Sequence, residues 1–169
     1  MNENNSITIF GGGKEGEERY GFYQKLRKKI KEYLKTKDGK EHKYAEYLLL
    51  APDLFYLLCK LALDPNVPGL TRTKIGAAIV YFISPFDIIP EGVLGPIGYL
   101  DDVVVASYVL NEALNKVDES IIQKYWLGDG DVLEVFQKVI KRADQLCGAG
   151  IWEKIKDALK ENIIKKQSL

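Results

Sequence analysis

Four carboxylate side chains lie in or just after a segment that is rich in proline and glycine and is expected to form the corner of a helical hairpin. Asp87 and Glu91 lie within this corner, residues 85–98, and Asp101 and Asp102 follow it closely. An all-oxygen ligand set suits Mg²⁺, Ca²⁺ or Mn²⁺ better than zinc. The four residues are therefore candidate ligands of a divalent cation. With one carboxylate as general base, the same set would fit a metal-dependent hydrolase or lyase.

A structural role would explain Asp101, Asp102 and Asp87 individually. Asp101 and Asp102 would cap a helix expected at residues 99–117 and favour its positive end, and Asp87 would cap or bridge a short turn. Closing the corner also brings like charges together in a partly dry setting. This costs free energy unless backbone N–H groups, a basic side chain, protonation or a bound cation compensates. We favour capping, and the cation site stays open beside it.

Apolar residues recur at the spacing of an α-helix over most of the chain. The expected helices cover residues 17–35, 41–63, 71–83, 99–117, 118–126, 131–147 and 151–166. Pro52 interrupts the second of these, which indicates a kink or a fresh helix start with Pro52 as its first residue. The predicted fold is all-α: one compact domain over residues 1–169, with about six to seven helices around a central apolar hairpin.

The N-terminus is expected to differ from this bundle. Residues 1–16 hold a short β-prone stretch and a cluster of glycines, which cannot nucleate a stable element alone, so we predict a flexible segment. Gly11, Gly13 and Gly16 formally match a dinucleotide-binding fingerprint. No βαβ unit follows them, and the match is rejected.

The expected hairpin helices, 71–83 and 99–117, are apolar nearly all round, so neighbouring helices or lipid must enclose them. The longest uncharged run, Ile75–Phe86, has 12 residues, whereas a membrane-spanning helix needs about 20. Carboxylates in the middle of the hairpin would also be costly in lipid. We therefore expect a soluble or peripheral protein, and a spanning hairpin is the less favoured alternative.

The corner of the hairpin carries the most specific motif. Residues 81–91 read Tyr-Phe-Ile-Ser-Pro-Phe-Asp-Ile-Ile-Pro-Glu, and residues 98–102 read Gly-Tyr-Leu-Asp-Asp. This stretch resembles the signature of the YkvA-like family of bacterial domains of unknown function, and the resemblance covers about residues 60–114. Glu91 stands where that family more often has aspartate. The resemblance implies a helical hairpin around the loop, and it implies no activity, because none is established for the family.

Composition narrows the classes of function. Hydrophobic residues make up 46% and charged residues 28% of the chain, as in soluble globular proteins. Lys+Arg and Asp+Glu are both 24, so no nucleic-acid partner is expected.

Cys59 and Cys147 stand far apart, without a histidine cluster, and are expected to be reduced core residues. No secretory signal is visible, which predicts a cytoplasmic location, with association to a membrane surface left open.

Basic residues concentrate between Lys25 and Lys43. This run would suit phosphates or anionic lipid, although Glu32, Asp38 and Glu41 dilute it. A solvated helix face explains the run better, and we favour that interpretation.

Three functions follow from these observations. The favoured one is a non-catalytic interaction or scaffold protein with an acidic loop, because no nucleophile, base or cofactor motif is recognisable. The alternatives are a peripheral or integral membrane-associated hairpin protein, and a divalent-metal-binding protein or metal-dependent hydrolase that uses the four carboxylates with Mg²⁺, Ca²⁺ or Mn²⁺. An unknown protein partner is expected, and the oligomeric state is left open.

Overall fold

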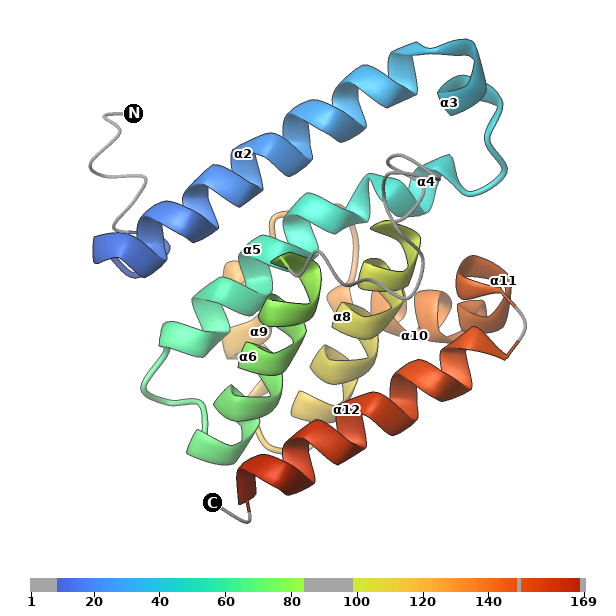
Figure 1. Cartoon of the computed structure of the whole chain (residues 1–169). Helices are drawn as coiled ribbons and strands as arrows, with labels where there is room; N and C mark the ends of the chain where they lie inside the picture. The colour runs from blue at the N-terminus through green and yellow to red at the C-terminus, as the bar shows by residue number, and fades with distance from the viewer. Residues whose placement is uncertain (1–8, 84–98, 149, 168–169) are drawn as a thin grey trace.

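The computed structural model describes residues 9–83, 99–148 and 150–167, apart from the side chains of residues 158, 159 and 162–167. All regular secondary structure in these ranges is helical, which confirms the predicted all-α class. The helices are α2 (Gly13–Lys35), α3 (Lys37–Glu41), α4 (Ala45–Leu48), α5 (Leu50–Leu63), α6 (Gly69–Ile83), α8 (Tyr99–Ala113), α9 (Glu119–Tyr125), α10 (Val132–Lys141), α11 (Ala143–Cys147) and α12 (Ile151–Gln167). In Figure 1, α2 and α12 lie on opposite sides, with α5, α6 and α8 between them.

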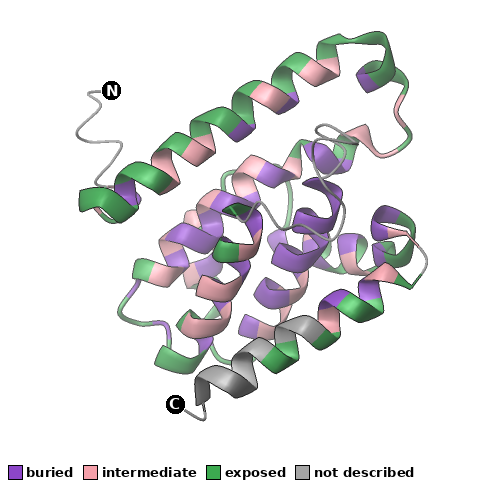
Figure 2. Ribbon diagram, viewed as in Figure 1, coloured by how far each residue is buried: buried purple, intermediate pink, exposed green. Residues whose placement is uncertain are grey.

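The central helix of the bundle is α8. Every residue from Tyr99 to Ser107 is buried, and Figure 2 shows this burial on all sides of the helix. The helix packs against α4, α5, α6, α10 and α11. The expectation that neighbouring helices enclose residues 99–117 is therefore confirmed for the helical part, although the helix ends at Ala113.

The other helix of the hairpin, α6, is buried on one side only. That side presents Thr71, Ile75, Ala78, Ile79 and Phe82. On the opposite side the side chain of Val80 is 64% exposed, so the expectation that α6 is enclosed is wrong for this side. Within the described residues, no helix combines the length and the apolar character that crossing a membrane requires.

Proline sets the start of α5. The helical segment before it, α4, ends at Leu48, and α5 begins at Leu50, so that Pro52 is the third residue of the new helix. A proline nitrogen has no hydrogen to donate, and the first turn of a helix is where this missing donor costs least. The predicted fresh start is found, but it lies two residues earlier than predicted, so that Pro52 is the third rather than the first residue of the new helix.

Aromatic side chains fasten the first half of α2 to the bundle. Phe22 lies with its ring centroid 4.8 Å from that of Phe55 in α5. Phe55 in turn lies 5.5 Å from Phe82 in α6. Phe10 is also buried against these rings, and α2 begins at Gly13, so the described part of the predicted flexible segment, residues 9–16, belongs to the folded domain. Residues 1–8 lie outside the described part of the chain.

At the other end of α2 the chain reverses through a close backbone contact. Thr36 caps α3 by accepting a hydrogen bond from the Gly39 N–H at 3.1 Å. A Cβ atom at Gly39 would overlap the carbonyl of Tyr33. Only glycine fits this turn, which holds the end of α2 beside α3.

A polar contact joins the end of α5 to α9. The Tyr125 hydroxyl donates to Oδ2 of Asp64 at 2.7 Å, and the Asn66 N–H donates to Oδ1 at 2.8 Å. Asp64 is the C-cap of α5, and its side chain is buried. The two donors hold the pKa of the Asp64 carboxyl below its usual value, because hydrogen bonds to a carboxylate favour its charged form.

This contact makes stability depend on pH in a defined direction. An aspartate whose folded pKa is depressed stabilises the fold above its unfolded pKa of about 3.9, and this contribution is lost as the pH falls through the folded value. We predict that Tyr125→Phe lowers the free energy of unfolding by about 1 to 2 kcal/mol near neutral pH. The deficit should shrink as the pH falls below about 4. Urea titrations of both proteins across this range test it, and a deficit that does not change with pH would contradict the assignment.

Candidate functional site

The four carboxylates singled out in the sequence fall into two groups. Asp87 and Glu91 lie outside the described residues. Asp101 and Asp102 lie in the first turn of α8, where their side chains are 2% and 0% exposed. The structure thus brings two of the candidate ligands together in the interior, at the end of α8 that faces the corner of the hairpin.

Asp101 links the two helices of the hairpin. The Tyr81 hydroxyl, near the end of α6, donates to its Oδ2 at 3.0 Å. The backbone N–H of Asp102 donates to its Oδ1 at 3.0 Å. Asp101 and Asp102 lie inside the first turn rather than before it. Asp101 nevertheless accepts a hydrogen bond from a backbone N–H of that turn and also reaches across to α6. Capping by Asp101 and Asp102 stays a prediction.

Cys147 is a close neighbour of this carboxylate pair. Burial raises the pKa of its thiol to about 12, and the charges of Asp101 and Asp102 add to the increase. The thiol therefore stays protonated at neutral pH and is a poor nucleophile or metal ligand. Both cysteines are buried and free, as predicted. The described residues contain no group of three or more His, Cys, Asp or Glu side chains placed to hold a metal ion.

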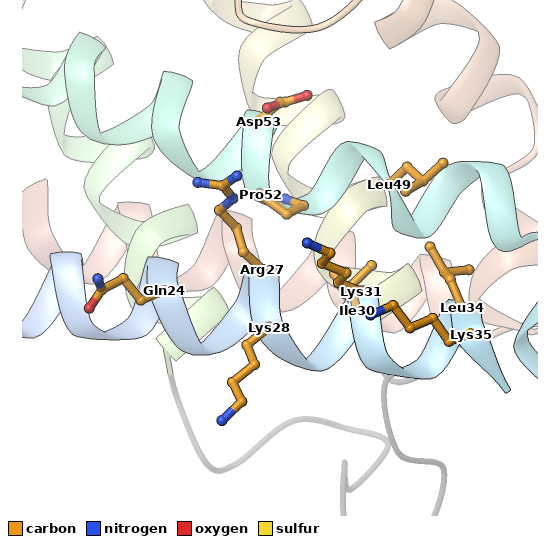
Figure 3. Close-up of a pocket in the computed structure, with 10 residues that line it drawn as sticks. All are labelled: Gln24, Arg27, Lys28, Ile30, Lys31, Leu34, Lys35, Leu49, Pro52 and Asp53. Atoms are coloured by element: carbon orange, nitrogen blue, oxygen red, sulfur yellow. The ribbon is translucent and has the colours of Figure 1, made fainter. Parts of the chain in front are cut away.

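A second candidate site lies on the surface, between α2 and the start of α5. It is a groove of about 710 Å³, shown in Figure 3. Its α2 wall runs from Gln24 to Lys35, and Leu49, Pro52 and Asp53 form the opposite wall. Ile30, Leu34, Leu49 and Pro52 make the interior apolar. The side chain of Leu49 is 57% exposed.

The way in which α2 is held explains the groove. The aromatic rings of Phe10 and Phe22 hold its first half against α5. At its far end the turn at Gly39 leads away into α3. Between these two attachments Ile30 packs into the core, and the partly buried Leu34 does not fill the space up to Leu49 and Pro52.

The rim of the groove is positively charged. Arg27, Lys28, Lys31 and Lys35 are all exposed, and no ion pair within 4.0 Å joins any of them to a described carboxylate. Asp53 is the acidic residue of the lining. Burial raises the pKa of its carboxyl, and the nearby Arg27 partly opposes the increase. The groove therefore has an apolar floor and a net positive rim.

Sequence reasoning recognised the basic run but did not find the groove. The four rim cations recur at intervals of one, three and four residues, which places them around one side of α2. This spacing could have been recognised in the sequence as a cationic face of the helix. The apolar wall across from them belongs to a different helix, and only the packing of α2 on α5 brings the two together.

The link between Tyr81 and Asp101 can be tested directly. We predict that Tyr81→Phe lowers the free energy of unfolding by about 1 to 3 kcal/mol, because the buried carboxyl loses a hydrogen-bond donor. The matched control is Tyr20→Phe, whose hydroxyl accepts a bond from the exposed Gln24 and should change stability by less than about 0.5 kcal/mol. Chemical denaturation measures both. Equal effects of the two substitutions would contradict a structural role for the buried contact.

Comparison with known proteins finds that the hairpin is similar to a family of unknown function. Residues 71–108 match the family described as "Protein of unknown function (DUF1232)", a stretch that includes Tyr81, Asp101 and Asp102. The chain is also 26% identical to "Uncharacterized protein ORF9" of Methanothermobacter thermautotrophicus over 106 residues, 63% of this chain and 73% of that protein. No solved structure matches the chain. The family match thus falls on the central α6–α8 hairpin, and both likenesses are to proteins of unknown function.

Proposed function

We propose that the protein is a non-catalytic interaction module, in which the α5–α6–α8 core is the scaffold and the groove between α2 and α5 is the binding surface. The observation that carries the proposal is the combination of an apolar interior with a cationic rim in one groove of about 710 Å³. Binding sites are typically concave and largely apolar, with a few polar groups that orient the ligand.

Energetic considerations support this use of the groove. Leu49 stands 57% exposed beside the partly buried Leu34 and Pro52. A ligand that covered these side chains would gain about 25 cal/mol for each Å² of apolar surface removed from water. No ion pair within the described residues holds Lys28, Lys31 or Lys35, so an acidic ligand would not have to break one to reach them. Arg27 already lies over the ring of Tyr23.

In this proposal the hairpin that resembles the YkvA-like family is the scaffold. The match to a family of unknown function over residues 71–108 supports it. The groove lies outside that stretch, since its lining comes from residues 24–35 and 49–53. In this proposal the hairpin provides a stable core, and the N-terminal helices determine what is bound.

An anionic apolar dye provides a direct test of the groove. We predict that anilinonaphthalene sulfonate binds saturably and fluoresces, and that Lys31→Glu/Leu49→Glu weakens its binding by about tenfold or more, because the variant removes charge attraction and apolar surface together. The matched control is Lys25→Glu/Leu70→Glu, which makes the same changes at exposed positions outside the groove lining; Leu70 is 52% exposed. Fluorescence titration compares them. Absence of saturable binding, or equal loss in both variants, would refute the proposal.

A second candidate function is divalent-cation binding by Asp87, Glu91, Asp101 and Asp102. The observation that favours it is the burial of Asp101 and Asp102 side by side in the first turn of α8. Buried carboxylates need compensation, and a bound cation would provide it. Mg²⁺, Ca²⁺ and Mn²⁺ are the ions that suit such oxygen ligands.

Isothermal titration tests this second candidate. A cation site predicts binding heat for at least one of Mg²⁺, Ca²⁺ and Mn²⁺, and loss of that heat in Asp101→Asn/Asp102→Asn, which removes two charges at nearly constant volume. The control is Glu161→Gln, an exposed carboxylate on α12. Circular dichroism shows whether the double variant is folded, and the same metals should raise the melting temperature of the wild-type protein only. No heat and no change in melting temperature for any of the three metals would exclude the site.

A further inference from the structure

We infer that the occupant of the groove is an acidic, amphipathic α-helix of a partner protein. This inference rests on the proposed function of the groove as a binding surface and adds the chemical nature of the ligand. It is drawn from the length of the groove, from the arrangement of its charges and from its concave shape.

The length of the groove suits a short helix. Its lining on α2 runs from Gln24 to Lys35, a separation of eleven residues, which corresponds to about 16 Å, or three helical turns. A helix that binds in a groove presents apolar anchors at positions i, i+3 or i+4, and i+7. Three turns carry three such anchors. The apolar interior is formed by Ile30, Leu34, Leu49 and Pro52, and it would receive the central anchors of such a helix.

The charges select an acidic partner. Arg27, Lys28, Lys31 and Lys35 line one wall, whereas Asp53 is the acidic residue of the other. In Figure 3 the side chains of Arg27 and Lys31 reach toward the α5 wall, on either side of Pro52. Carboxylates that flank the apolar stripe of a partner helix would lie beside them. Exposed ion pairs add modest affinity, but they steer association and disfavour basic partners.

The shape of the groove distinguishes a helix from a membrane. A flat anionic bilayer would meet the rim, yet it could not follow the recess between two helices. Ile30, in the floor, is 2% exposed and is therefore reached only by a side chain that enters the groove. Lys28 points away from α5 in Figure 3, so the lysines do not form one flat face. A convex, narrow ligand fits this geometry better than a planar surface.

A designed peptide tests the inference. The probe is a labelled peptide of about 18 residues, long enough for five turns, with leucines at i, i+4, i+7 and i+11 and glutamates beside them. We expect it to bind the full chain, and to bind at least about tenfold more weakly to Lys31→Glu/Leu49→Glu. Lys25→Glu/Leu70→Glu should bind like wild type. A scrambled peptide of equal composition, and one with lysines in place of glutamates, should each lose at least about tenfold in affinity.

The other results separate the inference from the proposed function. Equal binding of the scrambled peptide would overturn helix recognition, because charge alone would then account for affinity. Co-sedimentation with vesicles of phosphatidylglycerol and phosphatidylcholine that needs Lys31 and Leu49 would overturn it in favour of a membrane. No peptide binding, with saturable dye binding intact, would overturn the acidic helix and leave the groove as a binding surface. If the dye also failed to bind, both the acidic-helix inference and the proposed function of the groove would be refuted.

Discussion

The rest of the structure depends on the enclosure of α8. From Tyr99 to Ser107 this helix is buried on every side, so it has no face there on which to leave a polar group in water, and a charged group without a partner would be costly. Asp101 meets this requirement through the Tyr81 hydroxyl and the backbone of its own first turn. The same contact ties the end of α6 to the start of α8, on either side of the corner of the hairpin. The hydrogen bond that makes the burial of Asp101 possible is therefore also the bond that holds the two helices of the hairpin together.

Enclosing one helix leaves the helices around it half exposed. Around α8, the helices α6 and α10 each have a buried side and an exposed side, whereas α5 is covered further by α2. Helix α2 lies further from the centre, since its Phe22 and the preceding Phe10 pack against Phe55 of α5. An outer helix held near its two ends can leave a recess along its length without disturbing the core. This accounts for a binding groove at the edge of the bundle and a family match at its centre.

Much of this arrangement follows from local patterns in the sequence. Helical periodicity predicted the class, the proline at position 52 predicted the restart that begins α5, and the uniformly apolar 99–117 segment predicted an enclosed helix. The break at Arg142 between α10 and α11 was not predicted, because neither glycine nor proline marks it. The exposed side of α6 was also missed. An apolar stretch shows that burial is favourable, but it does not say how many neighbours the fold can supply.

The two candidate sites differ in the kind of information that reveals them. Asp101 and Asp102 are adjacent in sequence, so any helix that contains them brings them together. The groove joins cations on α2 to apolar residues on α5, and its existence depends on how two helices cross. The equal totals of 24 basic and 24 acidic residues indicate neither candidate site, because a net charge does not distinguish a buried acidic pair from an exposed basic rim. For this protein, local charge in its structural setting, rather than net charge, indicates what can bind.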